Sequence, residues 1–282
     1  MTDGNSKPTV LIDGFGHIIN ANDGEGGIDQ HNYTNGTVAQ SLRWYCAPES
    51  WGDERGSWKV DEDTGTLTVY PAPHRDFWQK TYYEPLLIKD DGAVLHANLP
   101  YYAKGDTTTP QYYTLQTTFR LYAVCQFDQA GLMIRWDEHH WIKTGIEVVD
   151  QKARLSCVVT NHGYSDWSTQ AWPSIVHDNS NDDDSSKKHL AVDCTLRLHC
   201  RGESFVVQVF NATETTKNDD EEEWEFVRIA HLHKPESSSS SIDSESRFMA
   251  GVFSCCPQDQ KGGHADFTAF QIEQGSQFGH SA

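Results

Sequence analysis

Cationic residues are scarce in this chain of 282 residues. Lysine and arginine number 22 against 41 aspartates and glutamates, which gives a formal net charge of −19 at pH 7. Binding to a phosphate backbone needs clustered basic side chains, and none is visible here. We therefore expect no nucleic-acid partner. Part of the acidic excess lies in Asp182–Asp184 and Asp219–Glu223, which are typical of solvated loops and could contact a protein partner.

Long apolar runs are also missing. No stretch approaches the roughly 20 apolar residues of a membrane helix, and the first ten residues, MTDGNSKPTV, lack the apolar core of a signal peptide. The seven cysteines are odd in number and show no framework spacing. We expect a soluble cytoplasmic protein with buried, reduced thiols and no membrane partner.

Helical periodicity does not persist over three turns anywhere, whereas short segments rich in β-branched and aromatic residues recur between turn signals. Within Tyr113–Cys125 an apolar set (Leu115, Phe119, Leu121 and Ala123) alternates with polar residues. The pattern predicts an all-β domain. The expected strands include Leu67–Tyr70, Phe77–Tyr83, Val94–Asn98, Tyr113–Cys125, Val192–Cys200, Phe205–Phe210, Trp224–Ala230, Phe248–Ser254 and Phe267–Ile272.

One domain accounts for most of the chain. Residues 1–40 are rich in glycine, aspartate and asparagine and predict an irregular N-terminal arm that could add one strand. Residues 41–275 carry the strand pattern, and 276–282 form a tail. Polar segments near 179–188, 213–223 and 235–246 predict loop insertions, because the strand pattern resumes after each.

The most informative stretch runs from Asp128 to Trp172, where three strands are followed by a predicted loop. Aligning the apolar sets pairs Trp136 with Ile142 and Leu132 with Ile146 across the first turn. This register leaves a three-residue loop, 138–140. The same rule pairs Val148 with Leu155 and Ile146 with Cys157 across a turn at 150–153.

The opposite face of this meander then carries Arg135, Lys143 and Glu147. Arg135 is predicted to face Lys143, and two cations in that position disfavour a sheet unless something neutralises them. Asp76, Asp166 or a bound ligand could supply the negative charge. The alternative is a solvated outer face with scattered charges. Trp136, Trp44 and Trp224 are expected in the core, and Trp141 is expected on the polar face as a stacking platform.

Five short segments in this order resemble the "regulation of enolase" type of domain of unknown function: Asp76–Thr81, Asp128–Arg135, Trp141–Lys143, Gly145–Glu147 and Ser165–Ser168. That family is similar to concanavalin A-like lectins and glucanases and to the accessory domain of β-xylosidases, and the resemblance covers Leu42 to Glu273. It implies a concanavalin A-like jelly-roll sandwich of two antiparallel sheets, for which we expect roughly 12 to 15 strands. It implies no established catalytic residues.

The sequence gives less support for catalysis or for metal binding. A glycoside hydrolase needs two carboxyl groups about 5–10 Å apart across a groove, for which Glu147, Asp137 and Asp166 are candidates. The glucanase pattern of two glutamates at positions i and i+4 or i+5 of one strand is missing, because on the central strand that spacing holds Lys143 and Glu147. His231 and His233 share a strand face and His139-His140 sit in a turn, but neither pair has an evident third ligand in the sequence. We therefore expect no metal, no cofactor and no catalytic residues, although an enzyme stays an alternative.

The sequence favours non-catalytic binding of a carbohydrate or small anionic metabolite in a concave groove of the sheet. A protein-interaction or regulatory module in sugar metabolism, acting through the acidic loops, is the competing hypothesis. The candidate ligand-binding residues are Asp76, Trp78, Arg135, Trp141, Lys143, Glu147, Asp166 and Trp167.

Overall fold

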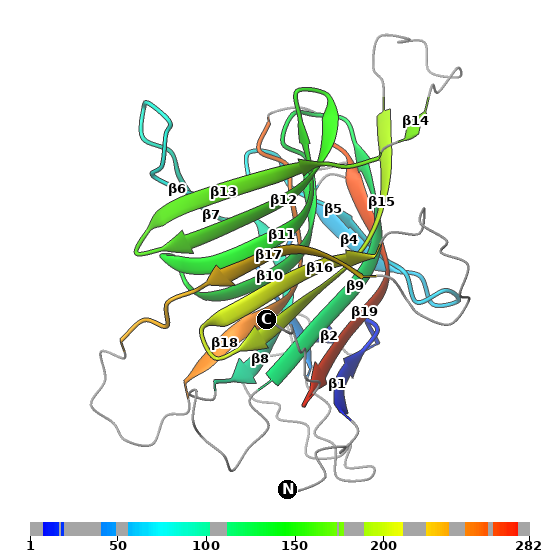
Figure 1. The fold of residues 1–282 in the computed structure, drawn as a ribbon. Coiled ribbons are helices and arrows are strands. Elements are labelled where there is room, and N and C mark those ends of the chain that lie inside the picture. Colours follow the sequence, from blue (N-terminus) through cyan, green and yellow to red (C-terminus); the bar gives the residue numbers. More distant parts are fainter. Residues whose placement is uncertain are drawn as a thin grey trace, which may run out of the picture.

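The computed structural model describes residues 8–16, 18–19, 41–48, 56–101, 112–173, 175–177, 189–210, 224–236, 246–258 and 262–275. Within these ranges the chain is all-β, as Figure 1 shows. No helix in the described part has the length and apolar character needed to cross a membrane. The loop insertions predicted near 179–188 and 213–223 lie outside the described residues, as does most of the one near 235–246.

Nineteen strands lie in the described part of the chain, more than the number expected from the sequence. They are β1 (Thr9–Asp13), β2 (Ile18–Ile19), β3 (Leu42–Tyr45), β4 (Ser57–Val60), β5 (Leu67–Tyr70), β6 (Phe77–Gln79), β7 (Ile88–Asp90), β8 (Ala93–Pro100), β9 (Tyr112–Ala123), β10 (Gln129–Asp137), β11 (His140–Val149), β12 (Lys152–Asn161), β13 (Tyr164–Ala171), β14 (Ile175–His177), β15 (His189–Arg201), β16 (Ser204–Phe210), β17 (Trp224–His231), β18 (Arg247–Cys255) and β19 (His264–Gln274).

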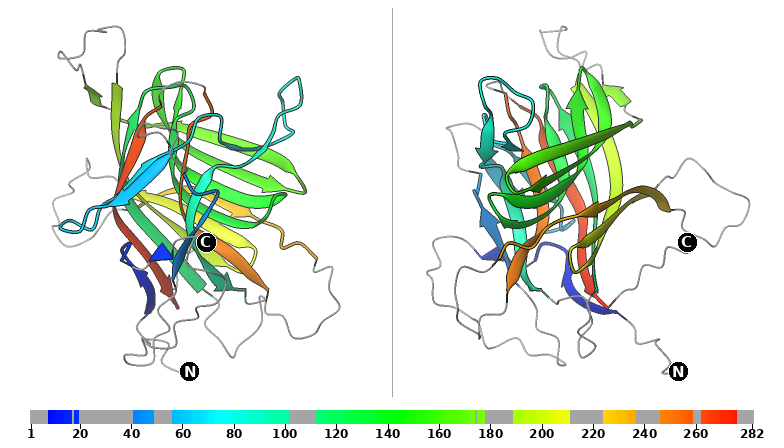
Figure 2. Two further views of the ribbon diagram at one scale, coloured as in Figure 1. Left: turned by 180° about the vertical axis from the view of Figure 1, so that it is seen from behind. Right: turned by 60° about the vertical axis from the view of Figure 1, so that its left-hand side comes forward.

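The strands form two large sheets and one hairpin. The nine-stranded sheet has the order β17-β16-β15-β9-β19-β5-β4, with β1 beside β19 and β14 beside β15. The eight-stranded sheet has the order β13-β12-β11-β10-β18-β8-β3-β2. Pairing is antiparallel except between β2 and β3. The two sheets stack as a sandwich (Figures 1 and 2), which confirms the predicted fold class.

The main core lies between the two sheets and collects the inward residues of both. Leu115, Phe119, Leu121 and Ala123 of β9 all belong to it, as their alternation predicted.

Six of the seven cysteines are buried, Cys46 is exposed, and no disulfide forms among the seven, all of which lie in described ranges. Trp136 and Trp44 pack partly buried against this core. Trp224 does not: it contacts Phe210 and Arg197 on the edge pair β16–β17.

A second apolar cluster lies on the outer side of the eight-stranded sheet. It contains residues of β10, β11, β12 and β18 together with Phe77 and Trp78 of the β6–β7 hairpin. The hairpin, drawn in cyan in Figure 2, projects beside the strands of this sheet. The sheet is therefore buried on both faces in this region, so the polar side chains on the outer face of its central strands are buried as well.

Two local predictions were wrong. The segment around Asp166 and Trp167, expected as a loop, is strand β13, which pairs along its whole length with β12. The arm expected to be irregular contributes two strands, β1 on the nine-stranded sheet and β2 on the eight-stranded sheet. β13 is polar and β1 and β2 are short, so their local patterns do not identify them as strands. β13 pairs with the preceding strand β12, whereas β1 pairs with the distant strand β19.

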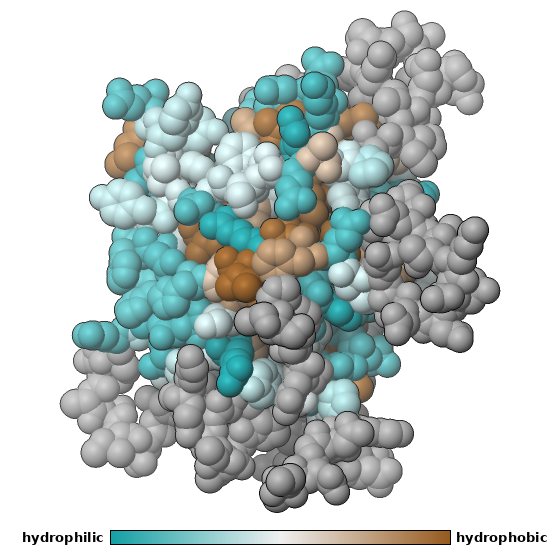
Figure 3. Space-filling view, viewed as in Figure 1, coloured by the Kyte–Doolittle hydropathy of each residue, from teal (hydrophilic) through white to brown (hydrophobic). Residues whose placement is uncertain are grey.

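Hydrophilic side chains cover most of the described surface in the view of Figure 3, with an apolar area near its centre. Two large apolar side chains of the edge strand β17, Phe226 and Ile229, are about half exposed.

A glycine pair brings β10 and β11 close together. Gly131 faces Gly145, and a Cβ added at Gly145 would clash with the carbonyl oxygen of Ala130 and lie 2.7 Å from the Cα of Gly131. The obstructing atoms belong to the backbone, so only glycine allows this approach.

We expect Gly145→Ala to lower the free energy of unfolding by about 1–3 kcal/mol, because the two strands must move apart. Denaturant unfolding of the purified chain measures this. Gly16→Ala is the control, since its added Cβ meets nothing within 4 Å. Equal, small losses in the two variants would contradict the close approach.

Candidate functional site

The register of the central hairpins decides which side chains meet on the outer face. Ile142 pairs with Ile134 and Ile146 with Ala130, not with Trp136 and Leu132 as predicted. Val148 pairs with Ala153, not with Leu155. Both predictions were wrong by two residues.

The turns explain these slips. The first hairpin closes with a two-residue turn and a bulge between Arg135 and Asp137. The second closes through Asp150 and Gln151, both in the left-handed region with φ of 49° and 61°, as in a tight two-residue hairpin turn. A shift of two residues leaves every side chain on its predicted face, because side chains alternate with a period of two.

Arg135, Lys143 and Glu147 therefore share the outer face, but Arg135 faces Trp141 across the strands and Lys143 faces Met133. This face is not open, since the β6–β7 hairpin covers it. Arg135 is 7% exposed, Lys143 is 3% exposed and Trp141 is fully buried. The prediction of an exposed indole at Trp141 was wrong, because no local pattern reveals a covering segment about 60 residues away.

Arg135 is neutralised by the end of the hairpin. Its Nε donates to Asp90 Oδ1 at 3.1 Å and its Nη2 to Asp90 Oδ2 at 2.6 Å. Tyr45 stacks beside the guanidinium, 4.4 Å from its ring centre, and donates its hydroxyl to Asp90 at 2.8 Å. This two-pronged pair neutralises Arg135, which is not among the residues that line the pocket described below.

Lys143 is neutralised by the start of the same hairpin. Its Nζ donates to Asp76 Oδ1 at 3.1 Å and to Gln129 Oε1 at 2.7 Å, and Gln129 donates in turn to Asp76 at 3.1 Å. Burial opposes the charged form of Lys143, but the charges of Asp76 and Glu147 outweigh it and raise the Lys143 pKa. The ammonium group is therefore charged in the folded protein.

The glycine pair Gly131 and Gly145 leaves space for the hydrogen-bond network of Lys143, Gln129 and Asp76. Gln129 faces Glu147 and Met133 faces Lys143, so the Lys143 side chain must pass the level of Gly131 and Gly145 to reach Gln129. A side chain at either glycine would stand on the same face and close this path.

Glu147 has a different environment. Ser156 donates to Glu147 Oε2 at 2.8 Å, and Trp167 Nε1 donates to Ser156 Oγ at 2.8 Å. Burial raises the pKa of Glu147 to about 7, with Lys143 acting in the opposite direction. Near neutral pH the carboxyl can therefore both donate and accept a hydrogen bond.

These groups form the floor of a pocket of about 250 Å³ between the sheet and the hairpin. Its walls are largely aromatic: Trp78 meets Tyr83 edge-on at 5.5 Å and Trp167 at 6.2 Å between ring centres. The lining residues are His74, Asp76, Trp78, Tyr83, Leu87, Lys89, Phe127, Lys143, Glu147, Val158, Trp167, Pro257 and Gln258.

Five of the eight predicted site residues line this pocket: Asp76, Trp78, Lys143, Glu147 and Trp167. Three do not. Arg135 is held by Asp90, and Trp141 lies beneath the hairpin. Asp166 points to the other side of its strand, where it pairs with Arg228 at 3.2 Å, because neighbouring residues of a strand face opposite sides.

Several functional residues were missed from the sequence. Tyr83 and Leu87 lie in the hairpin loop, and Pro257 and Gln258 follow β18, so only the tertiary fold brings them to the pocket. Ser156 bonds Glu147 diagonally across the two strands, since Arg154 is the residue that faces Glu147. Among the described residues, no three metal-ligand atoms converge in the pocket.

Comparisons with known proteins agree with this architecture. A curated protein of Saccharomyces cerevisiae, "Regulation of enolase protein 1", is 33% identical over 129 residues, covering 44% of this chain and 59% of the relative. The match thus spans less than two thirds of that protein. The crystal structure of a functionally unknown protein from Saccharomyces cerevisiae superimposes with a TM-score of 0.54 at 25% identity, over 80% of this chain and 96% of that one.

The GH43 BlXynB protein from Bacillus licheniformis also matches, at 13% identity and a TM-score of 0.48 over 77% of this chain and 34% of that one. Nothing further about this chain follows from a similarity at that level. The model of one family matches residues 51–275, which is most of the described sandwich. The chain belongs to that family, described as "Protein of unknown function (DUF1349)".

Proposed function

We propose that this domain binds a small carbohydrate in the pocket between β11 and the β6–β7 hairpin, without transforming it. The observation that carries the proposal is a polar floor of Asp76, Lys143 and Glu147 beneath walls of Trp78 and Trp167. Sugars present hydroxyl groups that donate and accept hydrogen bonds, together with apolar ring faces.

The charges of the floor favour a neutral ligand over an anionic one. In the floor, two carboxyl groups stand against one ammonium group, which already pairs with Asp76. Lys89, the other cation of the lining, donates to the His74 carbonyl at 2.8 Å and lies 3.9 Å from Asp91. A phosphate or carboxylate would need hydrogen-bond donors, and the Lys143 ammonium group of the floor already donates to Asp76 and Gln129. A sugar hydroxyl, in contrast, can donate to the unbonded oxygen of a carboxylate or accept from a protonated Glu147.

The size of the pocket limits the ligand. At about 250 Å³ it lies below the roughly 300–1,000 Å³ of drug-sized sites. It therefore suits a monosaccharide or the end of an oligosaccharide.

Binding is favoured over hydrolysis because Asp76 is committed to structure. Its Oδ1 accepts from the Phe77 backbone N–H, from Gln129 and from Lys143. These three hydrogen bonds fix the Asp76 carboxylate at the base of the hairpin and give it a structural role.

The name of the yeast relative, "Regulation of enolase protein 1", makes a regulatory role the second candidate. The acidic segments would then carry the contact with a protein partner, and the pocket would be incidental to it.

A glycan and metabolite binding screen tests the main proposal. We expect a carbohydrate hit whose affinity falls at least about tenfold, or about 1.4 kcal/mol, in both Trp167→Ala and Glu147→Gln. Asp166→Asn is the matched control, since it neighbours Trp167 but lies on the other face. Calorimetry gives the affinities. Equal affinity in all four proteins, or hits that are all anionic, would refute the assignment; cleavage of the hit by the parent alone would identify a hydrolase.

The raised pKa of Glu147 predicts a pH-dependent stability. The folded chain holds this proton up to about pH 7, whereas an unperturbed carboxyl releases it near 4.5. Between those values the unfolded chain ionises first, so this group lowers the free energy of unfolding as pH rises.

We expect the free energy of unfolding of the parent, relative to Glu147→Gln, to fall by about 3 kcal/mol from pH 4 to pH 8. Urea unfolding at several pH values measures the difference. A difference that is constant across this range would show that the Glu147 pKa is not raised.

The regulatory candidate predicts that residues 179–188 and 213–223, which lie outside the described ranges, carry a protein contact. Deleting both segments should abolish capture of enolase by the chain while leaving the carbohydrate affinity unchanged. Undiminished capture after deletion, measured by pull-down with purified enolase, would count against a contact through these acidic segments.

A further inference from the structure

Two histidines lie on one side of the chain where β17 ends. His231 is the last residue of this strand, and His233 follows it by two positions. Leu232, between them, is fully buried. Because side chains alternate along an extended backbone, burying Leu232 turns both imidazoles to the same, outer side. Their side chains are 62% and 38% exposed, so an ion in solution can reach them.

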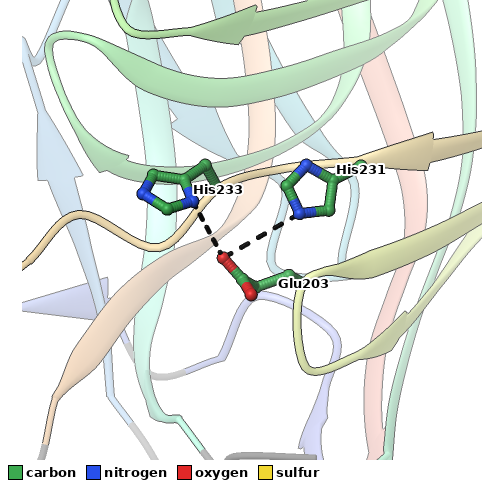
Figure 4. Close-up of side chains that lie close together, drawn as sticks. All are labelled: Glu203, His231 and His233. Atoms are coloured by element: carbon green, nitrogen blue, oxygen red, sulfur yellow. Dashed lines mark ion pairs between the residues drawn. The ribbon is translucent and has the colours of Figure 1, made fainter.

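A carboxylate from another element meets both rings. Glu203 belongs to the turn between β15 and β16, and its Oε1 lies 3.3 Å from His233 Nδ1 and 4.0 Å from His231 Nε2. Figure 4 shows the two imidazoles directed at this one oxygen. This is the third partner that the sequence did not reveal, because it lies 28 positions from His231.

The spacing suits a shared cation. Ligand atoms about 2.0–2.1 Å from a tetrahedral zinc ion lie roughly 3.4 Å from one another. The three ligand atoms of Glu203, His231 and His233 all lie within 4.8 Å of one another. Small side-chain rotations are enough to bring them to that separation.

The backbone of the cluster is already held in place. Asn161 of β12 accepts from the His233 N–H at 2.8 Å and donates to the His231 carbonyl at 2.9 Å. The Leu232 N–H donates to the Glu203 carbonyl at 3.0 Å, and the Lys234 N–H donates to Glu203 Oε1 at 2.6 Å. These hydrogen bonds connect the β15–β16 turn to the end of β17. Binding of an ion would therefore cost little conformational entropy, because the backbone is already ordered.

We infer that Glu203, His231 and His233 form a binding site for a divalent transition-metal ion of the zinc class. Two imidazoles and one carboxylate are ligands that Zn²⁺ accepts with a fourth position left open to water. None of the three residues lines the carbohydrate pocket, so the site is separate from the proposed function.

Zinc titration of the full chain without a histidine tag tests the inference. Calorimetry and competition with a chelating dye would compare the parent with Glu203→Gln and with the double variant His231→Ala/His233→Ala. We expect the double variant to bind one zinc equivalent fewer than the parent. In Glu203→Gln the affinity of that equivalent should fall at least about tenfold.

His74→Ala is the matched control, because it removes an exposed histidine from the pocket rim and should retain the full zinc stoichiometry. Cobalt(II) gives an independent readout: visible absorption of a tetrahedral ion should appear in the parent and be lost in the double variant. Equal unfolding midpoints without metal would show that the variants fold. Zinc binding of equal stoichiometry and affinity in parent and double variant, or no binding by the parent, would overturn the inference.

Discussion

Two buried cations on one face of the eight-stranded sheet determine how the outer side of this protein is built. Lys143 and Arg135 lie beneath the β6–β7 hairpin, and each is neutralised by an acid at one end of it, Asp76 at the start and Asp90 at the end. A buried charge without a partner is strongly destabilising, by about 3–5 kcal/mol when one member of a pair is removed. The hairpin must therefore dock in the one position that satisfies both cations.

The pocket is a consequence of this docking. The hairpin brings Trp78 and Tyr83 over the sheet, where Trp167 of β13 forms the opposite wall. The charge of Lys143 is satisfied by Asp76, so Glu147 is left with one hydroxyl donor, Ser156. Burial with so few donors raises the pKa of Glu147 to about 7. The carboxyl group can therefore form a further hydrogen bond with a hydroxyl group of a ligand.

The cluster of Glu203, His231 and His233 arises from a different part of the fold. Its residues come from the β15–β16 turn and the end of β17, on the edge of the nine-stranded sheet, and Asn161 of the other sheet holds them. The protein thus has a pocket on one sheet, which we propose binds a carbohydrate, and a cluster at the seam between the two sheets, which we propose binds a metal ion. The family is one of unknown function, and these two sites give it chemistry that can be tested.

The all-β class, the positions of most of the long strands and the faces of the central strands followed from the sequence alone. Leu67–Tyr70 matches β5 residue for residue, and Arg135, Lys143 and Glu147 share a face as predicted. That last result survived a register error of two residues, because alternation in a strand repeats every two.

The contacts that those side chains make could be read only from the folded structure. The register depended on Asp150 and Gln151, which adopt the left-handed conformation in the turn. Glycine in a sequence predicts that conformation, whereas aspartate and glutamine predict it much less strongly. The partner of Arg135 lies 45 positions away. Burial of a strand face depends on which distant segment covers it, and the local sequence pattern of the strand does not predict that segment.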